Sequence, residues 1–188
     1  MGPTELAGLI RAGESQQVEF KTSLAEQVDG LQSLCGMVNS DVARGAILFG
    51  VKRDGTVCGV EPGDLDRAQQ SMMQVTAAKF EPRLVVTTEV QELDARRVLV
   101  LTASRFTGIA YHEFDGRAFI REGTTTRRLT LIEKNALARA RNRDLHPGPW
   151  KCSQCNSWVG LLGSVKVTEH GVERSYRCGC GGEFWPAT

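Results

Sequence analysis

The chain has 188 residues, of which 41% are hydrophobic and 24% are charged, a balance that indicates a globular protein and excludes a disordered one. This length predicts one domain of ordinary size followed by a small appendage. The formal net charge of +1 does not exclude nucleic acid as a partner, because such binding requires only a local basic patch.

Hydrophobic periodicity predicts alternating helices and strands before a proline-rich linker. Apolar residues spaced by three and four indicate amphipathic helices, whereas alternation and short apolar runs indicate strands. The expected helices cover residues 4–12, 26–39, 65–80 and 130–143, and the expected strands cover residues 18–21, 46–49, 56–60, 84–90, 97–102 and 118–121.

The first expected strand, residues 18–21, carries a charged face. Glu19 and Lys21 lie opposite the apolar residues Val18 and Phe20, because side chains alternate between the two faces of a strand. Glu14 comes just before the strand and can fold back over the same face. Two carboxylates and an ammonium on one face form a candidate metal or nucleic-acid site. The alternative is an edge strand with ordinary solvated charges.

Basic residues concentrate between residues 117 and 143. Arginine binds phosphates in bidentate geometry, and hydroxyl groups and glycine amides add neutral donors. Residues 123–128, which we expect to form a loop, combine all three kinds of donor. The alternative is a solvated surface balanced by neighbouring acidic residues. The candidate phosphate contacts are Arg117, Arg121, Thr124, Thr125, Thr126, Arg127 and Arg128.

Four cysteines follow a stiff linker at residues 146–149. Cys152 and Cys155 form one pair and Cys178 and Cys180 a second, and the segment between the pairs is expected to form a hairpin. This arrangement resembles a zinc ribbon, in which four thiolates bind a structural zinc ion tetrahedrally. Two disulfides are the alternative. The segment is too short to hold a core unaided, so a metal ion is physically expected.

The absence of targeting features predicts a cytoplasmic protein without a membrane partner. No apolar run approaches the roughly 20 residues that span a bilayer. Residues 1–7 lack the basic start and apolar core of a signal peptide. Thiols stay reduced in the cytoplasm, which favours zinc over disulfides for the clustered cysteines.

Several motifs, taken in order, resemble the Schlafen AlbA-like domain, which occurs in many bacterial regulators and in the vertebrate Schlafen proteins. Each motif is weak alone, but their order makes the resemblance specific. The likeness covers roughly residues 5–135. The motifs are Glu14 with Glu19-Phe20-Lys21, a helix that reaches Asn39, Gly45, the turn Gly50-Val51 to Gly55, and Arg121-Glu-Gly-Thr-Thr-Thr126.

This resemblance implies nucleic-acid binding and, in some members, a metal-dependent ribonuclease built on two glutamates and an aspartate. Glu14 and Glu19 match the glutamates, which would hold Mg²⁺ or Mn²⁺, and Lys21 would steady the phosphate. The aspartate is expected where this chain has Arg53. Asp54 follows one residue later, and on a strand that shift turns a side chain to the other face. The nuclease hypothesis can take Asp54 as its third acid only if a turn here relaxes that shift, whereas the binding hypothesis does not depend on it.

The sequence thus predicts an α+β fold with two domains. Residues 1–145 would form a Schlafen AlbA-like domain, a mixed β-sheet with packed helices, and residues 146–188 a zinc ribbon. The leading hypothesis is a regulator that binds DNA or RNA. The second is a metal-dependent nuclease, and the third is an adaptor that binds a protein through the ribbon. Formation of a homodimer is left open.

Overall fold

The computed structural model describes residues 2–106, 109–145, 161–168, 171–177 and 183–184. The chain divides into two units, Met1–Asn142 and Arg143–Thr188. The elements up to the end of the last helix are α1 (Pro3–Ala12), β1 (Val18–Lys21), α2 (Gln27–Asn39), β2 (Arg44–Phe49), α3 (Leu65–Lys79), β3 (Phe80–Glu81), β4 (Val86–Leu93), β5 (Arg96–Ser104), β6 (Glu113–Phe114), β7 (Arg117–Glu122), β8 (Thr125–Arg128) and α4 (Leu131–Leu145).

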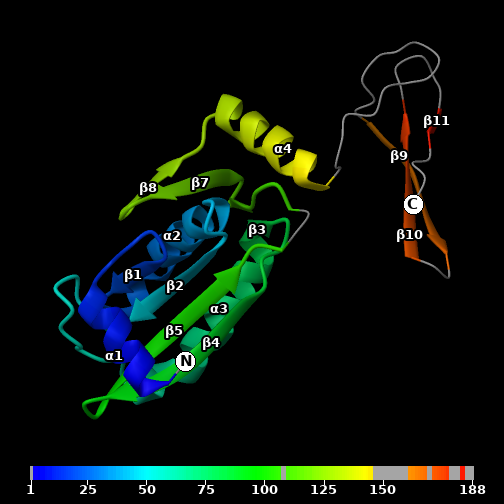
Figure 1. The fold of residues 1–188 in the computed structure, drawn as a ribbon. Helices are drawn as coiled ribbons and strands as arrows, with labels where there is room; N and C mark the ends of the chain where they lie inside the picture. Colours follow the sequence, from blue (N-terminus) through cyan, green and yellow to red (C-terminus); the bar gives the residue numbers. More distant parts are fainter. Residues whose placement is uncertain (1, 107–108, 146–160, 169–170, 178–182, 185–188) are drawn as a thin grey trace. The chain divides into compact units, whose positions relative to one another are not determined.

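Two four-stranded sheets form the framework of the first unit. One has the order β1-β2-β5-β4 and the other the order β3-β6-β7-β8. β1 runs parallel to β2, whereas the pairs β2–β5 and β4–β5 are antiparallel. The first sheet is therefore mixed, which confirms the expected α+β fold with a mixed sheet. Figure 1 shows β7 and β8 beside α2, and α4 beside β8.

Apolar side chains pack on both faces of the mixed sheet. Leu6 and Ile10 of α1 belong to a buried cluster with Val18, Phe20 and Leu48. A second cluster joins α2 and α3 to the sheet and contains Leu34, Met37, Phe49, Met72, Leu99 and Phe119. β2 contributes to both clusters, because successive side chains of a strand point to opposite faces. The expected strand at residues 46–49 is therefore covered on both faces.

α2 also packs closely on the second sheet. A Cβ atom added to Gly36 would lie 3.1 Å from the backbone nitrogen of Arg121 and from the backbone carbon of Ile120. Asn39, at the end of the helix, donates to the carbonyl oxygens of His112 at 2.8 Å and Phe119 at 2.9 Å. Gly36, which has no side chain, lets α2 lie close to β7, and the buried amide of Asn39 holds it there.

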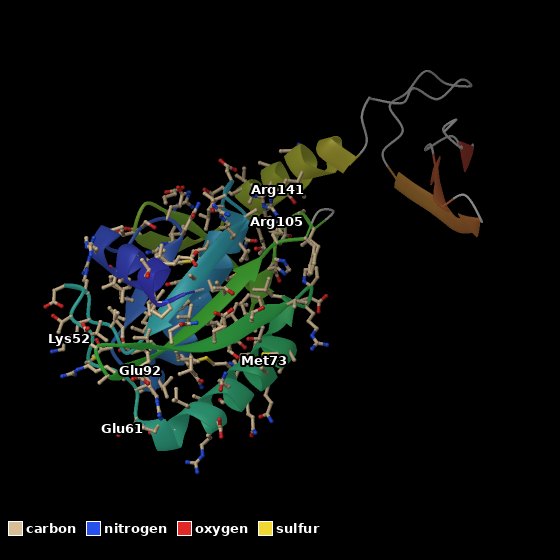
Figure 2. The ribbon with its side chains drawn as sticks, turned by 60° about the horizontal axis from the view of Figure 1, so that its bottom comes forward. Lys52, Glu61, Met73, Glu92, Arg105 and Arg141 are labelled. Carbon is tan, nitrogen blue, oxygen red and sulfur yellow. The ribbon has the colours of Figure 1, made fainter. Side chains whose placement is uncertain are left out.

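α4 is tied to the end of α2 by one arginine. Arg141 donates from Nη2 to the carbonyl oxygen of Asn39 at 2.6 Å and from Nη1 to that of Ala110. It lies beside Arg105 (Figure 2). Burial and the charge of Arg105 lower the pKa of Arg141 to about 10. Helix carbonyls without a partner in the last turn favour a cation in this position.

Two local predictions about strands are wrong. Residues 56–60 form no regular strand, and only the single bridge between Val51 and Val57 is present in this described segment. Gly50 has a φ of +92°, and its carbonyl oxygen accepts from both Cys58 and Gly59, so the chain turns away before a ladder can form. Residues 123–128 are not a loop, because after a turn at Gly123 (φ +59°) they continue as β8, which pairs with β7.

The second unit contains an antiparallel sheet with the order β11-β10-β9. β9 is Leu161–Thr168, β10 is Gly171–Arg177 and β11 is Glu183–Phe184. The expected hairpin between the cysteine pairs is confirmed by the pairing of β9 with β10. The zinc prediction concerns Cys152, Cys155, Cys178 and Cys180, which lie outside the described residues. Among the described helices, none combines the length and apolar character needed to cross a membrane.

Candidate functional site

β1 places Glu19 and Lys21 on one face, as the alternation predicts. Val18 and Phe20 are buried below them, 6% and 4% exposed, and they hold the strand against β2. Lys21 Nζ lies 3.0 Å from Glu19 Oε1, and the two side chains are 13% and 12% exposed. The charged face of β1 is therefore a largely enclosed ion pair.

Arg121 of β7 reaches the same carboxylate. Its Nη2 lies 2.6 Å from Glu19 Oε2, and its side chain is only 1% exposed. Nε donates to the carbonyl oxygen of Ser15 at 2.9 Å, and Nη1 donates to Thr126 Oγ1 at 3.2 Å. Arg121 thus joins β7 and β8 to β1 and to the segment before it.

Glu14 folds back over β1 and meets a cation from another loop. Its Oε1 accepts a hydrogen bond from the backbone nitrogen of Phe20 at 3.1 Å. Its Oε2 lies 3.5 Å from Nε of Arg53, whose side chain is 87% exposed while that of Glu14 is 13% exposed. Glu14 is thus anchored to the strand on one side and paired with a solvent-facing guanidinium on the other.

The family comparison matches this same region. The model described as Schlafen, AlbA_2 covers residues 14–130, a range that begins at Glu14 and includes β1, α2, β2 and the β7–β8 hairpin.

The chain belongs to the Schlafen AlbA_2 family. No curated protein matches it. The structure of the DIP2311 protein from Corynebacterium diphtheriae is similar to it, with 19% identity and a TM-score of 0.48, over 67% of this chain and 24% of that one. The N-terminal domain of a RecG-related protein from Nitrosomonas europaea has 18% identity and a TM-score of 0.48, over 70% of this chain and 95% of that domain. This chain therefore spans about a quarter of the length of DIP2311.

The carboxylates of this Schlafen AlbA_2 domain do not fit the divalent cation that the resemblance implies. Both oxygens of Glu19 contact cations of the chain, and those of Glu14 contact a backbone amide and Arg53. Mg²⁺ and Ca²⁺ sites require carboxylate oxygens that can turn toward the metal. Within the part of the chain that the structure describes, no three His, Cys, Asp or Glu side chains gather closely enough to hold a metal ion.

Asp54, the proposed third acid, is bonded within its own turn. Its Oδ1 accepts a hydrogen bond from the backbone nitrogen of Thr56 at 2.9 Å. That bond holds the pKa of the Asp54 carboxyl below its usual value. An aspartate that accepts from the backbone two residues on is a normal way to stabilise a tight turn.

The candidate phosphate contacts occupy different environments. Arg121 is buried, whereas Thr124, Thr125, Arg117 and Arg128 are exposed on or beside the β7–β8 hairpin. Arg127 is paired, with Nη2 2.7 Å from Glu122 and Nη1 2.8 Å from Glu133. Hydrogen bonds to these two glutamates raise the pKa of Arg127.

Two features of this site were not predicted from the sequence. One is the ion pair of Arg53 with Glu14, and the other is the ion pair of Arg121 with Glu19. Gln16 also helps to hold Arg121 in place, because its Nε2 donates to the carbonyl oxygen of Arg121 at 3.3 Å. The only available signal was that Arg53 stands where the family resemblance expects an acid.

Proposed function

We propose that this protein binds nucleic acid through the face formed by β1, the Arg53 loop and the tip of the β7–β8 hairpin. The observation that carries the proposal is the charge of the ion-pair cluster on that face. Three cations, Lys21, Arg53 and Arg121, meet two carboxylates, Glu14 and Glu19. An excess of positive charge favours a phosphate over a metal ion.

The hairpin tip adds donors next to this charge. Thr126 touches Arg121, which touches Glu19, so the turn at Gly123 and Thr124 lies close to β1. Hydroxyl groups and backbone amides are common phosphate contacts that position a nucleic acid without reading its sequence. Membership in the Schlafen AlbA_2 family is consistent with this role.

The paired arginine of β8 can also serve a phosphate. Arg127 is 42% exposed and Glu122 is 60% exposed, and exposed ion pairs are weak because water screens them. A phosphate can therefore replace one of the two carboxylates around Arg127 at little cost. Arg128, the next residue, is exposed and supplies a second guanidinium.

Equilibrium binding tests the proposal directly. Fluorescence anisotropy with single-stranded RNA, single-stranded DNA and duplex DNA should show affinity that falls steeply with salt, because phosphate contacts release counterions. The double variant R127A/R128A should bind several-fold more weakly and reduce the salt slope by about one for each phosphate that the variant no longer holds. Arg67→Ala, at an exposed position of α3, is the matched control and should bind normally. Failure to bind any of the three nucleic acids at low salt would refute the proposal and leave the adaptor hypothesis.

We also propose that the second unit holds one structural zinc ion through Cys152, Cys155, Cys178 and Cys180. The paired spacing of the cysteines supports this, as does the β9–β10 hairpin that lies between the pairs along the chain. Four thiolates complete a tetrahedral shell and leave no open position for catalysis.

A further inference from the structure

Glu19 is the counterion of a buried arginine. Arg121 is 1% exposed, and its other donors are directed at the carbonyl oxygens of Ser15 and Val18 and at Thr126. Its guanidinium cannot leave this place without giving up all of these acceptors. If Glu19 turned away to bind a metal ion, a buried charge would lose its partner, which is strongly unfavourable.

Glu14 is held in a different way, by one fixed donor and one mobile one. The backbone nitrogen of Phe20 belongs to β1 and cannot move independently of the strand. Arg53, by contrast, is 87% exposed and touches Glu14 only through Nε, at 3.5 Å. Of the three cations that contact Glu14 or Glu19, Arg53 can therefore reorient freely, while Lys21 and Arg121 are 13% and 1% exposed.

We propose that Arg53 takes the place of a divalent cation on this face, so that the protein binds a phosphate here without metal. The guanidinium neutralises Glu14 through Nε, and Nη1 and Nη2 remain to donate to one phosphate group in bidentate geometry. The phosphate role rests on the proposed function, whereas the exclusion of metal follows from the contacts of the two glutamates alone.

Reversing the net charge of this ion-pair cluster tests the proposal. Three cations now face two carboxylates. The substitution Arg53→Asp reverses the balance to three carboxylates and two cations, and it also frees Oε2 of Glu14. Carboxylate oxygens are the ligands that Mg²⁺ and Mn²⁺ prefer, so Glu14 and the new carboxylate together should hold a metal ion while Glu19 stays paired with Arg121.

Titration with Mn²⁺, followed by the electron paramagnetic resonance signal of the free ion, measures metal binding by the 188-residue chain purified in the presence of zinc. The unsubstituted protein and the control Lys52→Asp should show no stoichiometric binding, whereas Arg53→Asp should bind Mn²⁺ at least tenfold more tightly than either. Lys52 is an exposed neighbour on the same loop (Figure 2). Stoichiometric Mn²⁺ binding by the unsubstituted protein that Glu14→Gln abolishes would overturn the proposal. Equal weak binding by Arg53→Asp and Lys52→Asp would show that Arg53 is not what excludes the metal.

Nucleic-acid binding supplies the second readout. Affinity for single-stranded RNA should be the same with and without added Mn²⁺, and Arg53→Ala should weaken it several-fold while Arg67→Ala does not. Binding or cleavage that requires Mn²⁺ would overturn the metal-free role. If no nucleic acid is bound under any condition, the phosphate role and the proposed function both fail, while the Mn²⁺ titration still decides whether the face excludes metal.

Discussion

At the scale of single residues, Arg121 shows how one side chain can hold a site together without facing solvent. It was a candidate phosphate contact by sequence, but its guanidinium is buried and bonded to β1, β8 and the segment before β1. Its charge is balanced by Glu19, 2.6 Å away. The family motifs around Glu19 and Arg121, which are far apart in the sequence, are therefore joined by one buried ion pair.

Removing the charge of Glu19 while keeping its shape should destabilise the protein substantially. Glu19→Gln leaves Arg121 without a counterion in a place that water does not reach, and breaking a buried ion pair in this way costs about 3–5 kcal/mol. Urea unfolding of the first unit, followed by circular dichroism, should show this as a lower midpoint with an unchanged slope.

The natural control is another glutamate–arginine pair of the same unit. Glu122→Gln removes the partner of Arg127 at a place where the side chains are 60% and 42% exposed, and solvent screens such pairs. The midpoint of Glu122→Gln should stay close to that of the unsubstituted protein. Equal midpoints for Glu19→Gln and Glu122→Gln would contradict the role assigned to Glu19.

The site was predictable from the sequence only where its residues are close neighbours along the chain. Alternation placed Glu19 and Lys21 on the same face of β1, which the structure confirms. The pairing of Glu19 with Arg121 joins residues of β1 and β7, and no local pattern encodes it. Such contacts depend on which strands meet, and topology decides that.

At the scale of elements, α2 is the connection between the two sheets. Its apolar side chains pack on the mixed sheet, while Gly36 and Asn39 approach the second sheet. Gly36 is needed here because its neighbours include the backbone of β7, which cannot move aside as a flexible side chain would. A glycine within a helix weakens the helix by itself, so its presence indicates a steric requirement.

The same substitution at two helical glycines should have opposite effects. Gly36→Ala brings a methyl group to 3.1 Å from the backbone of Arg121 and Ile120, and overpacking of this kind typically costs about 1–3 kcal/mol. Gly8→Ala in α1 meets nothing within 4 Å and should gain about 0.5–1 kcal/mol from helix propensity alone. Thermal unfolding of the two variants measures the difference, and a higher melting temperature for Gly36→Ala would contradict the close approach of α2 to β7.

Elements were predictable where a long periodic pattern existed and not where the chain is short or rich in glycine. The four helices and the central strands follow the hydrophobic spacing to within a few residues. β8 was missed because residues 125–128 are all Thr and Arg, which carry no apolar alternation. Its strand conformation comes from pairing with β7. Residues 56–60 have the composition of a strand but form none, because Gly59 within the segment and Gly50 before it both have a positive φ.

At the scale of the whole molecule, the chain combines a unit with its own apolar core and a much smaller one. The first unit buries two clusters of large side chains. The second unit, Arg143–Thr188, contains the sheet β11-β10-β9 and is below the size at which a core alone stabilises a domain. Metal binding would then supply the free energy of folding for the second unit.

Loss of zinc should therefore unfold the second unit and leave the first unit folded. The purified protein should contain one equivalent of zinc by mass spectrometry of the metal, and Cys178→Ser should lose it. Cys58→Ser, at a partly exposed cysteine of the first unit, is the matched control and should keep its zinc. Because the first unit has two apolar clusters of its own, its unfolding transition should be nearly unchanged in Cys178→Ser, while limited proteolysis should cleave beyond residue 145. A full equivalent of zinc in Cys178→Ser, or none in the unsubstituted protein, would show that the four cysteines do not form a zinc site.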